Sequence, residues 1–330
     1  MFNSVFFNSR MARTATALGV GVLLCGAASA TENGVLRYAN GWGGGELALP
    51  LLPGTNFTVG VLRYESTSPK DNSGNAPQVD LGGGMTAAVS AKVNATVTIP
   101  RLAWISEQKL WGGYVGVVAL VPHLSQSLTI GMTGPAIAPV QAGLDAQAAA
   151  MSGDGNAWGD LEVGPVLSWP GDKTNVTLAL SVIFPTGQYD KNRSVNAGAG
   201  DYKTLRPTLS VGYAADGWDM GTRVAVAFNE RNKATDVKSG TYLTADFSVL
   251  KAFGSLRAGV QGYLMQQLSN DEGPGVAADG NKGRAYALGP AISWLSQDGT
   301  WLVDAKWLKE FGVVNRPQGT ASWISIAKQF

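Results

Sequence analysis

Residues Trp301–Glu310 read WLVDAKWLKE, and this stretch near the C-terminus decides the fold. Its apolar side chains, Trp301 and Val303 among them, fall on one parity, whereas the charges of Asp304 and Lys306 fall on the other. Side chains of a β-strand point alternately to opposite faces. The stretch is therefore predicted to be a strand with one apolar and one charged face.

The same alternation recurs along the chain, clearly so in residues 160–169, 222–229 and 256–268. Segments of about ten residues are long enough to cross a bilayer as tilted strands. In a soluble sandwich the charged face would meet water, whereas in a membrane barrel it would face the lumen. Alternation alone does not choose between these two folds.

The lengths of the connections favour the membrane barrel, because short and long ones alternate. The short connections are expected at 170–172, 215–217, 252–254 and at Pro122, and the long ones at 185–201, 230–239 and 269–282. Outer-membrane barrels combine short periplasmic turns with long outer loops. We predict an all-β fold, a transmembrane antiparallel β-barrel of about fourteen strands. The number would be about twelve if residues 80–105 form one strand instead of two and, to keep the number even, residues 56–64 are not a strand.

The N-terminal residues 1–30 are predicted to be a signal peptide. Two basic residues, Arg10 and Arg13, precede the apolar stretch 17–27, and Ala28-Ser29-Ala30 is a cleavage site of small residues. Residues 31–55 are rich in Gly and Pro, and we expect them to fold back into the lumen as a plug. Residues 56–330 would form the barrel itself.

The chain ends on Phe330, directly after an alternating segment. A terminal aromatic residue in this position is the usual assembly signal of outer-membrane barrels, so we expect the barrel-assembly machinery to be a partner. Together with the signal peptide, this ending predicts a place in the bacterial outer membrane. Outer-membrane lipid and lipopolysaccharide would then surround the barrel.

Polar side chains on the inward parity are the candidate functional residues. In one hypothesis they form a salt-bridged network that braces the barrel wall, since buried charges must be paired. In the other they form a polar constriction that selects solutes. The two hypotheses are compatible. The candidates that line the lumen or its constriction are Asp160, Glu162, Arg206, Arg223, Asp246, Arg257, Gln261, Tyr263, Asp304 and Lys306.

Composition argues against several other functions. The net charge of +1 gives no reason to expect a nucleic-acid partner. One histidine, His123, and one cysteine, Cys25, rule out a metal site built from His and Cys, and we expect no cofactor. Acyl-transfer enzymes of the outer membrane generally need a histidine beside a nucleophile or carboxylate, so we expect no enzyme.

Several short motifs occur in a characteristic order: Glu32-Asn33-Gly34, Leu52-Pro53-Gly54-Thr55, the FPTGQYD stretch at 184–190 and Gly289-Pro290. In their order and spacing the chain resembles the outer-membrane proteins of the meta-pathway of phenol degradation, over nearly the whole mature chain. The resemblance implies a barrel distantly similar to the fatty-acid and toluene channels of the outer membrane, which have fourteen strands and an N-terminal plug. It implies no catalytic or ligand-binding residue.

The resemblance and the unassigned segment 31–55 lead to two functional hypotheses. The first is a porin-like channel for passive uptake of small hydrophobic, aromatic compounds, linked to aromatic compound degradation. The second is a structural or surface-binding outer-membrane barrel with a closed lumen and no transport. We expect mutation of Arg223 and Asp304 to separate them, since it would change uptake in the first case and only stability in the second.

Overall fold

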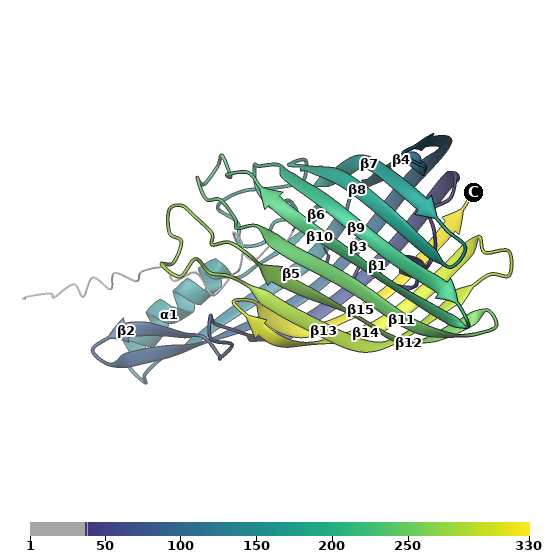
Figure 1. Ribbon diagram of the computed structural model, residues 1–330. Helices are drawn as coiled ribbons and strands as arrows, with labels where there is room; N and C mark the ends of the chain where they lie inside the picture. The colour runs from purple at the N-terminus through teal and green to yellow at the C-terminus, as the bar shows by residue number, and fades with distance from the viewer. Residues whose placement is uncertain (1–36, 38) are drawn as a thin grey trace, which may run out of the picture.

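The computed structural model describes residue 37 and residues 39–330, in which a single antiparallel sheet contains fifteen strands. The signal-peptide prediction and residues 31–36 and 38 lie outside the described residues. Figure 1 shows strongly tilted strands that wrap into a barrel. The strands are β1 (Gly54–Pro69), β2 (Gln78–Gly82), β3 (Met85–Leu110), β4 (Gly113–Leu120), β5 (His123–Thr133), β6 (Gly153–Trp158), β7 (Leu161–Pro170), β8 (Thr174–Phe184), β9 (Thr204–Ala215), β10 (Trp218–Asn229), β11 (Tyr242–Phe253), β12 (Leu256–Gln267), β13 (Arg284–Leu295), β14 (Trp301–Val314) and β15 (Pro317–Gln329).

The barrel closes at β1, which pairs with β15 on one edge and with β3 on the other. Val59, for example, lies opposite Ile326 of β15 and opposite Pro100 of β3. The closed ring contains twelve strands: β1, β3, β4 and β7 to β15. Closure pairs the backbone groups that an open sheet edge would leave exposed to lipid. The predicted all-β transmembrane barrel is confirmed, with the lower of the two strand numbers, but residues 56–64 belong to the ring as part of β1.

The count falls to twelve because β3 is one uninterrupted strand of 26 residues. Its second edge pairs first with β4 and then with β5, and the register runs on from Arg101↔Leu120 to Thr98↔His123. The chain therefore does not turn at Pro122, and that prediction was wrong. Proline removes one donor from the ladder, which separates β4 from β5, but its fixed φ still suits an extended chain.

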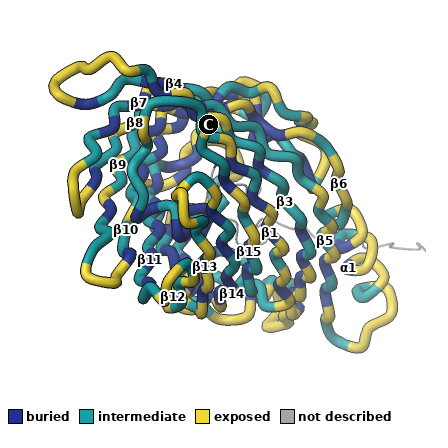
Figure 2. Tube along the Cα trace, turned by 90° about the vertical axis from the view of Figure 1, so that its right-hand side faces the viewer, coloured by how far each residue is buried: buried dark blue, intermediate teal, exposed yellow. Residues whose placement is uncertain are grey.

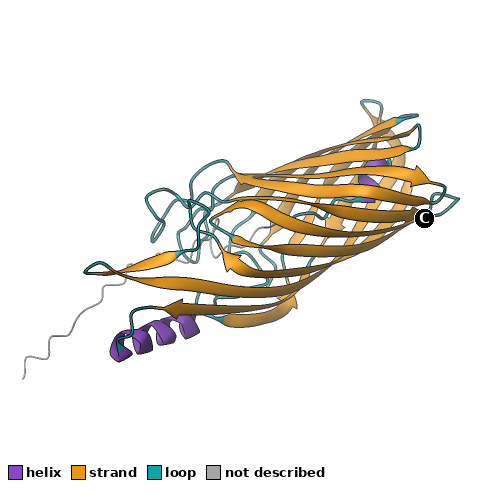
Figure 3. Cartoon of the chain, turned by 90° about the horizontal axis from the view of Figure 1, so that it is seen from below, coloured by secondary structure: helices purple, strands orange, loops and turns teal. Residues whose placement is uncertain are grey.

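Above the ring, at the end with the long loops, the sheet continues on one side only. Strands β2 and β5 pair with β3, β6 pairs with β5, and helix α1 (Ala138–Met151) packs against β5 (Figure 3). Leu144 and Ala148 of the helix form a buried cluster with Ala87, Ile130 and Met132. This part of the chain forms an apolar wall that rises above the barrel.

Strands β6 and β7 likewise run almost continuously, separated only by Gly159 and Asp160. Their neighbour β8 ends at Phe184, so no described strand pairs with the second edge of β6. The loop 185–203 lies there instead, with a hydrogen bond of 3.2 Å from the Gln188 N–H to the Trp158 carbonyl. The backbone of this loop thus forms a hydrogen bond with the edge of β6 that no strand pairs with.

The outer face of the ring is apolar, as a surface in contact with lipid must be. On β13, Leu288, Ile292 and Trp294 are exposed, whereas the alternating Ser293 is buried. Figure 2 shows the barrel from the end that carries the short turns and the C-terminus, with exposed residues recurring along its strands and at the turns. No helix among the described residues is long and apolar enough to cross a membrane.

The short turns gather at the end that carries Phe330. At one of them, between β9 and β10, Asp216 and Gly217 both have positive φ, of 57° and 76°. Such a two-residue turn matches the twist of the two strands, and Gly meets its requirement without strain. The Phe330 N–H bonds to the Thr55 carbonyl at 2.8 Å, so both ends of the barrel sequence meet here. The role of Phe330 in assembly stays a prediction.

Candidate functional site: the barrel lumen

Residues 39–53 precede β1, and their backbone is bound by side chains of the inner barrel wall. We call residues 39–53 the inner segment. The N–H groups of Gly41 and Gly43 donate to the two carboxylate oxygens of Asp246, on β11, at 3.0 and 2.9 Å. Asp246 is fully buried. A Cβ atom at residue 43 would lie only 2.8 Å from the Asp246 Cβ atom, so the close approach requires glycine.

A second carboxylate, Asp304 on β14, binds the next turn of the inner segment. Here the chain forms a short 3-10 helix, η2 (Gly45–Ala48), and the Gly45 N–H donates to Asp304 at 2.9 Å. Gln261 donates to the same carboxylate at 2.8 Å, and the Ser293 hydroxyl also donates to it. The Lys306 ammonium lies 3.9 Å from Asp304 and donates to the Gly43 carbonyl. These hydrogen bonds and this charge partner compensate the buried carboxylate.

The side chains of the inner segment also fit the barrel wall. The Trp42 ring lies against Gly60 of β1, where any Cβ atom would overlap it. Its centre is 5.7 Å from that of the Trp323 ring, in an edge-to-face arrangement. Arg223 pairs with Glu46 of η2 at 3.3 Å. The segment is therefore held by residues of β1, β10, β11, β14 and β15, and by Asn175 of β8, which donates to the Ala48 carbonyl at 2.8 Å.

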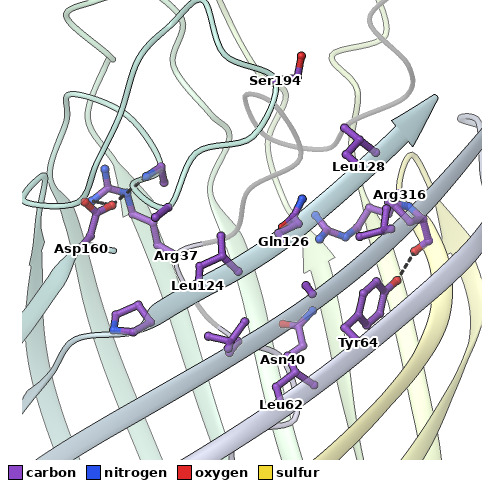
Figure 4. A pocket seen from close by; sticks show the side chains of 18 of the residues that line it. Arg37, Asn40, Leu62, Tyr64, Leu124, Gln126, Leu128, Asp160, Ser194 and Arg316 are labelled. Carbon is purple, nitrogen blue, oxygen red and sulfur yellow. Dashed lines mark hydrogen bonds and ion pairs between the residues drawn. The ribbon is translucent and has the colours of Figure 1, made fainter. Parts of the chain in front are cut away.

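A cavity of about 650 Å³ lies between the inner segment and the outer loops. We call it the upper cavity. Its walls are largely apolar: Val93, Ala95, Val97 and Ile99 come from β3, and Leu124, Leu128 and Ile130 come from β5. Figure 4 shows Leu62 and Leu124 between two polar groups, Arg37 with Asp160 on one side and Tyr64 with Arg316 on the other.

The polar group near Tyr64 is built around Glu310, on β14. Tyr64 donates to this carboxylate at 2.8 Å, Tyr263 donates to its other oxygen, and the Gly319 N–H lies at 2.7 Å. Glu310 is itself buried. This arrangement links β1, β12, β14 and β15 on one side of the cavity.

The second polar group contains two ion pairs at the level where the wall is interrupted. Arg37 lies 3.4 Å from Asp160, and Arg206 is paired with Glu162. Arg206 also donates to the Arg37 carbonyl at 3.2 Å, which joins the two pairs. Asp160 accepts the N–H groups of Gly187 and Ala199 at 2.9 and 3.0 Å, so it fixes the loop 185–203 as well.

A smaller cavity of about 230 Å³ lies beyond the inner segment, toward the short turns. We call it the lower cavity. Many of its lining side chains are polar, and they include Asn56, Arg101, Asn175, Thr177, Ser210 and Arg223. The two cavities share four lining residues: Trp42, Leu120, Glu162 and Arg206. The lumen is thus divided by a layer of these side chains and the inner segment.

The structure places all ten predicted candidates inside the barrel, in four groups. Five hold the inner segment or support the residues that do: Arg223, Asp246, Gln261, Asp304 and Lys306. Asp160, Glu162 and Arg206 lie together near the interruption of the wall. Tyr263 belongs to the Glu310 group, and Arg257 pairs with Asp219 near the short turns, apart from both cavities.

Sequence reasoning missed several residues of the site. Glu310 falls on the charged parity of β14 and could have been included on that ground. Arg37, Asn40 and Trp42 lie in a segment without periodicity, which carries no signal of what its side chains contact. Among the described residues, no three His, Cys, Asp or Glu side chains form a group that could hold a metal ion.

Comparison with known families shows which family the chain belongs to. The model of the family described as "Putative MetA-pathway of phenol degradation" matches residues 66–326. The chain belongs to this family. The match covers most of the barrel, from the end of β1 to β15, and it confirms the resemblance found in the sequence motifs. A search of curated proteins found no match.

Solved structures agree on the architecture. An outer membrane channel from Pseudomonas putida F1 is 14% identical, with a TM-score of 0.62 over 85% of this chain and 97% of that one. A FadL homologue of Pseudomonas aeruginosa (10% identity, TM-score 0.39, 88% and 97% covered) and a mutant of the TodX monoaromatic hydrocarbon channel (11%, 0.40, 86% and 94%) are more distant. At 14% identity the first match shows a shared fold. The chain is an outer-membrane β-barrel.

Proposed function

We propose that this barrel is a channel for the passive entry of small hydrophobic compounds, aromatic ones included. The observation that carries the proposal is the upper cavity. Its volume of about 650 Å³ falls within the range of about 300–1,000 Å³ that is usual for pockets that bind small molecules. Such pockets are mostly apolar with a few polar groups, as this one is.

The position of the cavity suits uptake. Its lining runs from loop residues such as Pro274 and Arg316 down to Ile99 and Trp42. A solute that enters from the outer side can exchange water for apolar side chains at every level of this path. Lipopolysaccharide resists hydrophobic solutes, so a protein-lined apolar path would speed their entry. Membership of a family described by phenol degradation supports aromatic compounds as the solute class.

The test is the initial rate of entry of radiolabelled toluene, at low external concentration, into cells with and without the barrel. Ala95 is 6% exposed and lines the upper cavity, so Ala95→Trp would fill part of it. Ala305 has the outward parity of Trp301 and Trp307 on β14, so Ala305→Trp adds the same ring on the lipid side. We expect faster entry with the wild type and with Ala305→Trp, and a loss of most of that gain with Ala95→Trp.

A second candidate function is a structural barrel without transport. The buried hydrogen bonds that hold the inner segment favour it, because they close the lumen as it stands. The toluene-entry experiment distinguishes this function from the uptake proposal. Equal entry with and without the barrel, in cells where heat-modified mobility on gels proves the barrel folded, would refute the uptake proposal and leave the structural one.

A further inference from the structure

The upper and lower cavities meet at a thin layer of side chains beside the inner segment. Among the described residues, only Trp42, Leu120, Glu162 and Arg206 line both cavities. Three of these four belong to the barrel wall: Leu120 to β4, Glu162 to β7 and Arg206 to β9. The wall around this layer is therefore formed largely by barrel strands, and the inner segment contributes only the Trp42 ring.

The inner segment itself is bound away from this layer. Helix η2 lies against β9, β10, β11 and β14. Its backbone is held by Asp246 and Asp304, and the Ala48 carbonyl accepts a hydrogen bond of 2.8 Å from Asn175. Withdrawal of the segment would leave two buried carboxylates without these donors, which is costly in a protein interior. Joining the two cavities by moving the whole inner segment would thus cost considerable free energy.

Movement of a few side chains would join the cavities without withdrawing the inner segment from Asp246 and Asp304. We infer that the Arg206–Glu162 ion pair, with Leu120 and Trp42, is a side-chain gate between the two cavities, and that it opens while the inner segment stays bound. The inference rests on the proposed function and deepens it by naming the route of the solute, down the inner faces of β3, β4 and β7.

The chemistry of the layer fits a gate for uncharged solutes. Arg206 and Glu162 both have flexible side chains, and each is about 6–7% exposed where they pair. Because their charges compensate one another, the closed layer presents no net charge to a neutral molecule. When they separate, the polar side chains of the lower cavity, such as Thr177 and Ser210, can solvate them. A larger share of the lining residues is polar below the gate than above it.

The test needs the inner segment locked in place, and the cysteine content makes this simple. The only cysteine of the chain is Cys25, which lies within the predicted signal peptide. A Cβ atom at residue 45 would lie 3.2 Å from that of Ser293, close to the separation of about 3.5–4.5 Å in disulfides, and 2.9 Å from an Asp304 carboxylate oxygen, which would have to shift slightly. Gly45→Cys/Ser293→Cys should therefore tie η2 to β13, and neither residue lines a cavity.

Ionic conductance in planar bilayers tests the gate without any assumption about the solute. In the oxidised, locked protein, we expect Glu162→Ala/Arg206→Ala to raise single-channel conductance at least severalfold over the locked parent. Conductance that stays at the parent level in the locked background, and rises only after reduction, would overturn the gate, because the segment would then have to move.

Toluene entry provides a second test of the gate, in which substitutions at the adjacent residues Leu120 and Ala119 are compared. Leu120→Trp would obstruct the layer, whereas Ala119→Trp places the same ring on the opposite face of β4. We expect the locked protein to keep at least half of the wild-type entry rate, and Leu120→Trp but not Ala119→Trp to lose most of it. Loss of entry on locking, restored by reduction, would also overturn the gate. No entry by the wild type would instead refute the proposed function, and the conductance arm would still decide on the gate.

Discussion

Replacement of Asp246 by alanine should release the upper part of the inner segment. This carboxylate accepts the N–H groups of Gly41 and Gly43 at 3.0 and 2.9 Å in a fully buried position. Hydrogen bonds to a charged group contribute about 1.5–3 kcal/mol each. Loss of both would weaken binding of the segment by about 3 kcal/mol or more, which corresponds to about a 100-fold rise in its unbound fraction.

Hydrogen exchange measures this change directly, because amides exchange from locally opened states. We expect the amides of Gly41 and Gly43 to exchange about 100-fold faster in Asp246→Ala, while the strands of the ring keep their protection. Asp219 provides a matched control, since it is another buried aspartate of the inner wall but pairs with Arg257 near the short turns. Exchange at residues 41–45 that stays within threefold of the wild type, or an equal effect of Asp219→Ala, would refute the role of Asp246 in holding the segment.

Three further substitutions test other parts of the structure. Gly60→Ala would force the Trp42 ring off β1 at a cost of about 1–3 kcal/mol for overpacking, and we expect faster hydrogen exchange of residues 41–45. Gly143→Ala, in α1 with open space around it, should leave that exchange unchanged. Glu310→Ala leaves Tyr64, Tyr263 and the Gly319 N–H without their acceptor, so we expect about 2–4 kcal/mol less stability in urea titrations of the refolded barrel; a change below about 0.5 kcal/mol would contradict the described network. Leu288→Arg puts a charge on the lipid-facing side of β13 and should cost about 2–4 kcal/mol in folding into liposomes, whereas Phe253→Arg, beside a short turn, should cost about 0–1 kcal/mol; equal costs would contradict the placement of these residues in the bilayer.

The barrel could be predicted from the sequence because its determinants are local and periodic. A strand such as Trp301–Glu310 carries its two faces in its own alternation, and this also identified Asp304 and Lys306 as inward residues. The strand number was harder to predict, because a proline signals a turn in most contexts. At Pro122 the continuous partner β3 keeps the chain extended, and only the register across strands reveals this.

The partners of the inward charges could not be predicted, because they depend on contacts between distant parts of the chain. Asp246 is paired with backbone groups some 200 residues earlier, as the hydrogen bond from Gly41 shows. No pattern in the sequence connects the two. The abundance of Gly and Pro in residues 31–55 predicted a plug in the lumen, but it did not indicate that the carboxylates that bind residues 43 and 45 come from β11 and β14. That the segment acts as a plug stays a prediction.

The most direct measurement is the position of an aromatic solute in crystals of the barrel. Crystals grown with 4-bromotoluene would reveal the bromine by its anomalous scattering. If the barrel is a channel for hydrophobic solutes, the strongest bromine peak lies in the upper cavity, between Val97 of β3 and Leu128 of β5. Bromine peaks found only on the lipid-facing surface, with the upper cavity empty at saturating 4-bromotoluene, would contradict the proposal.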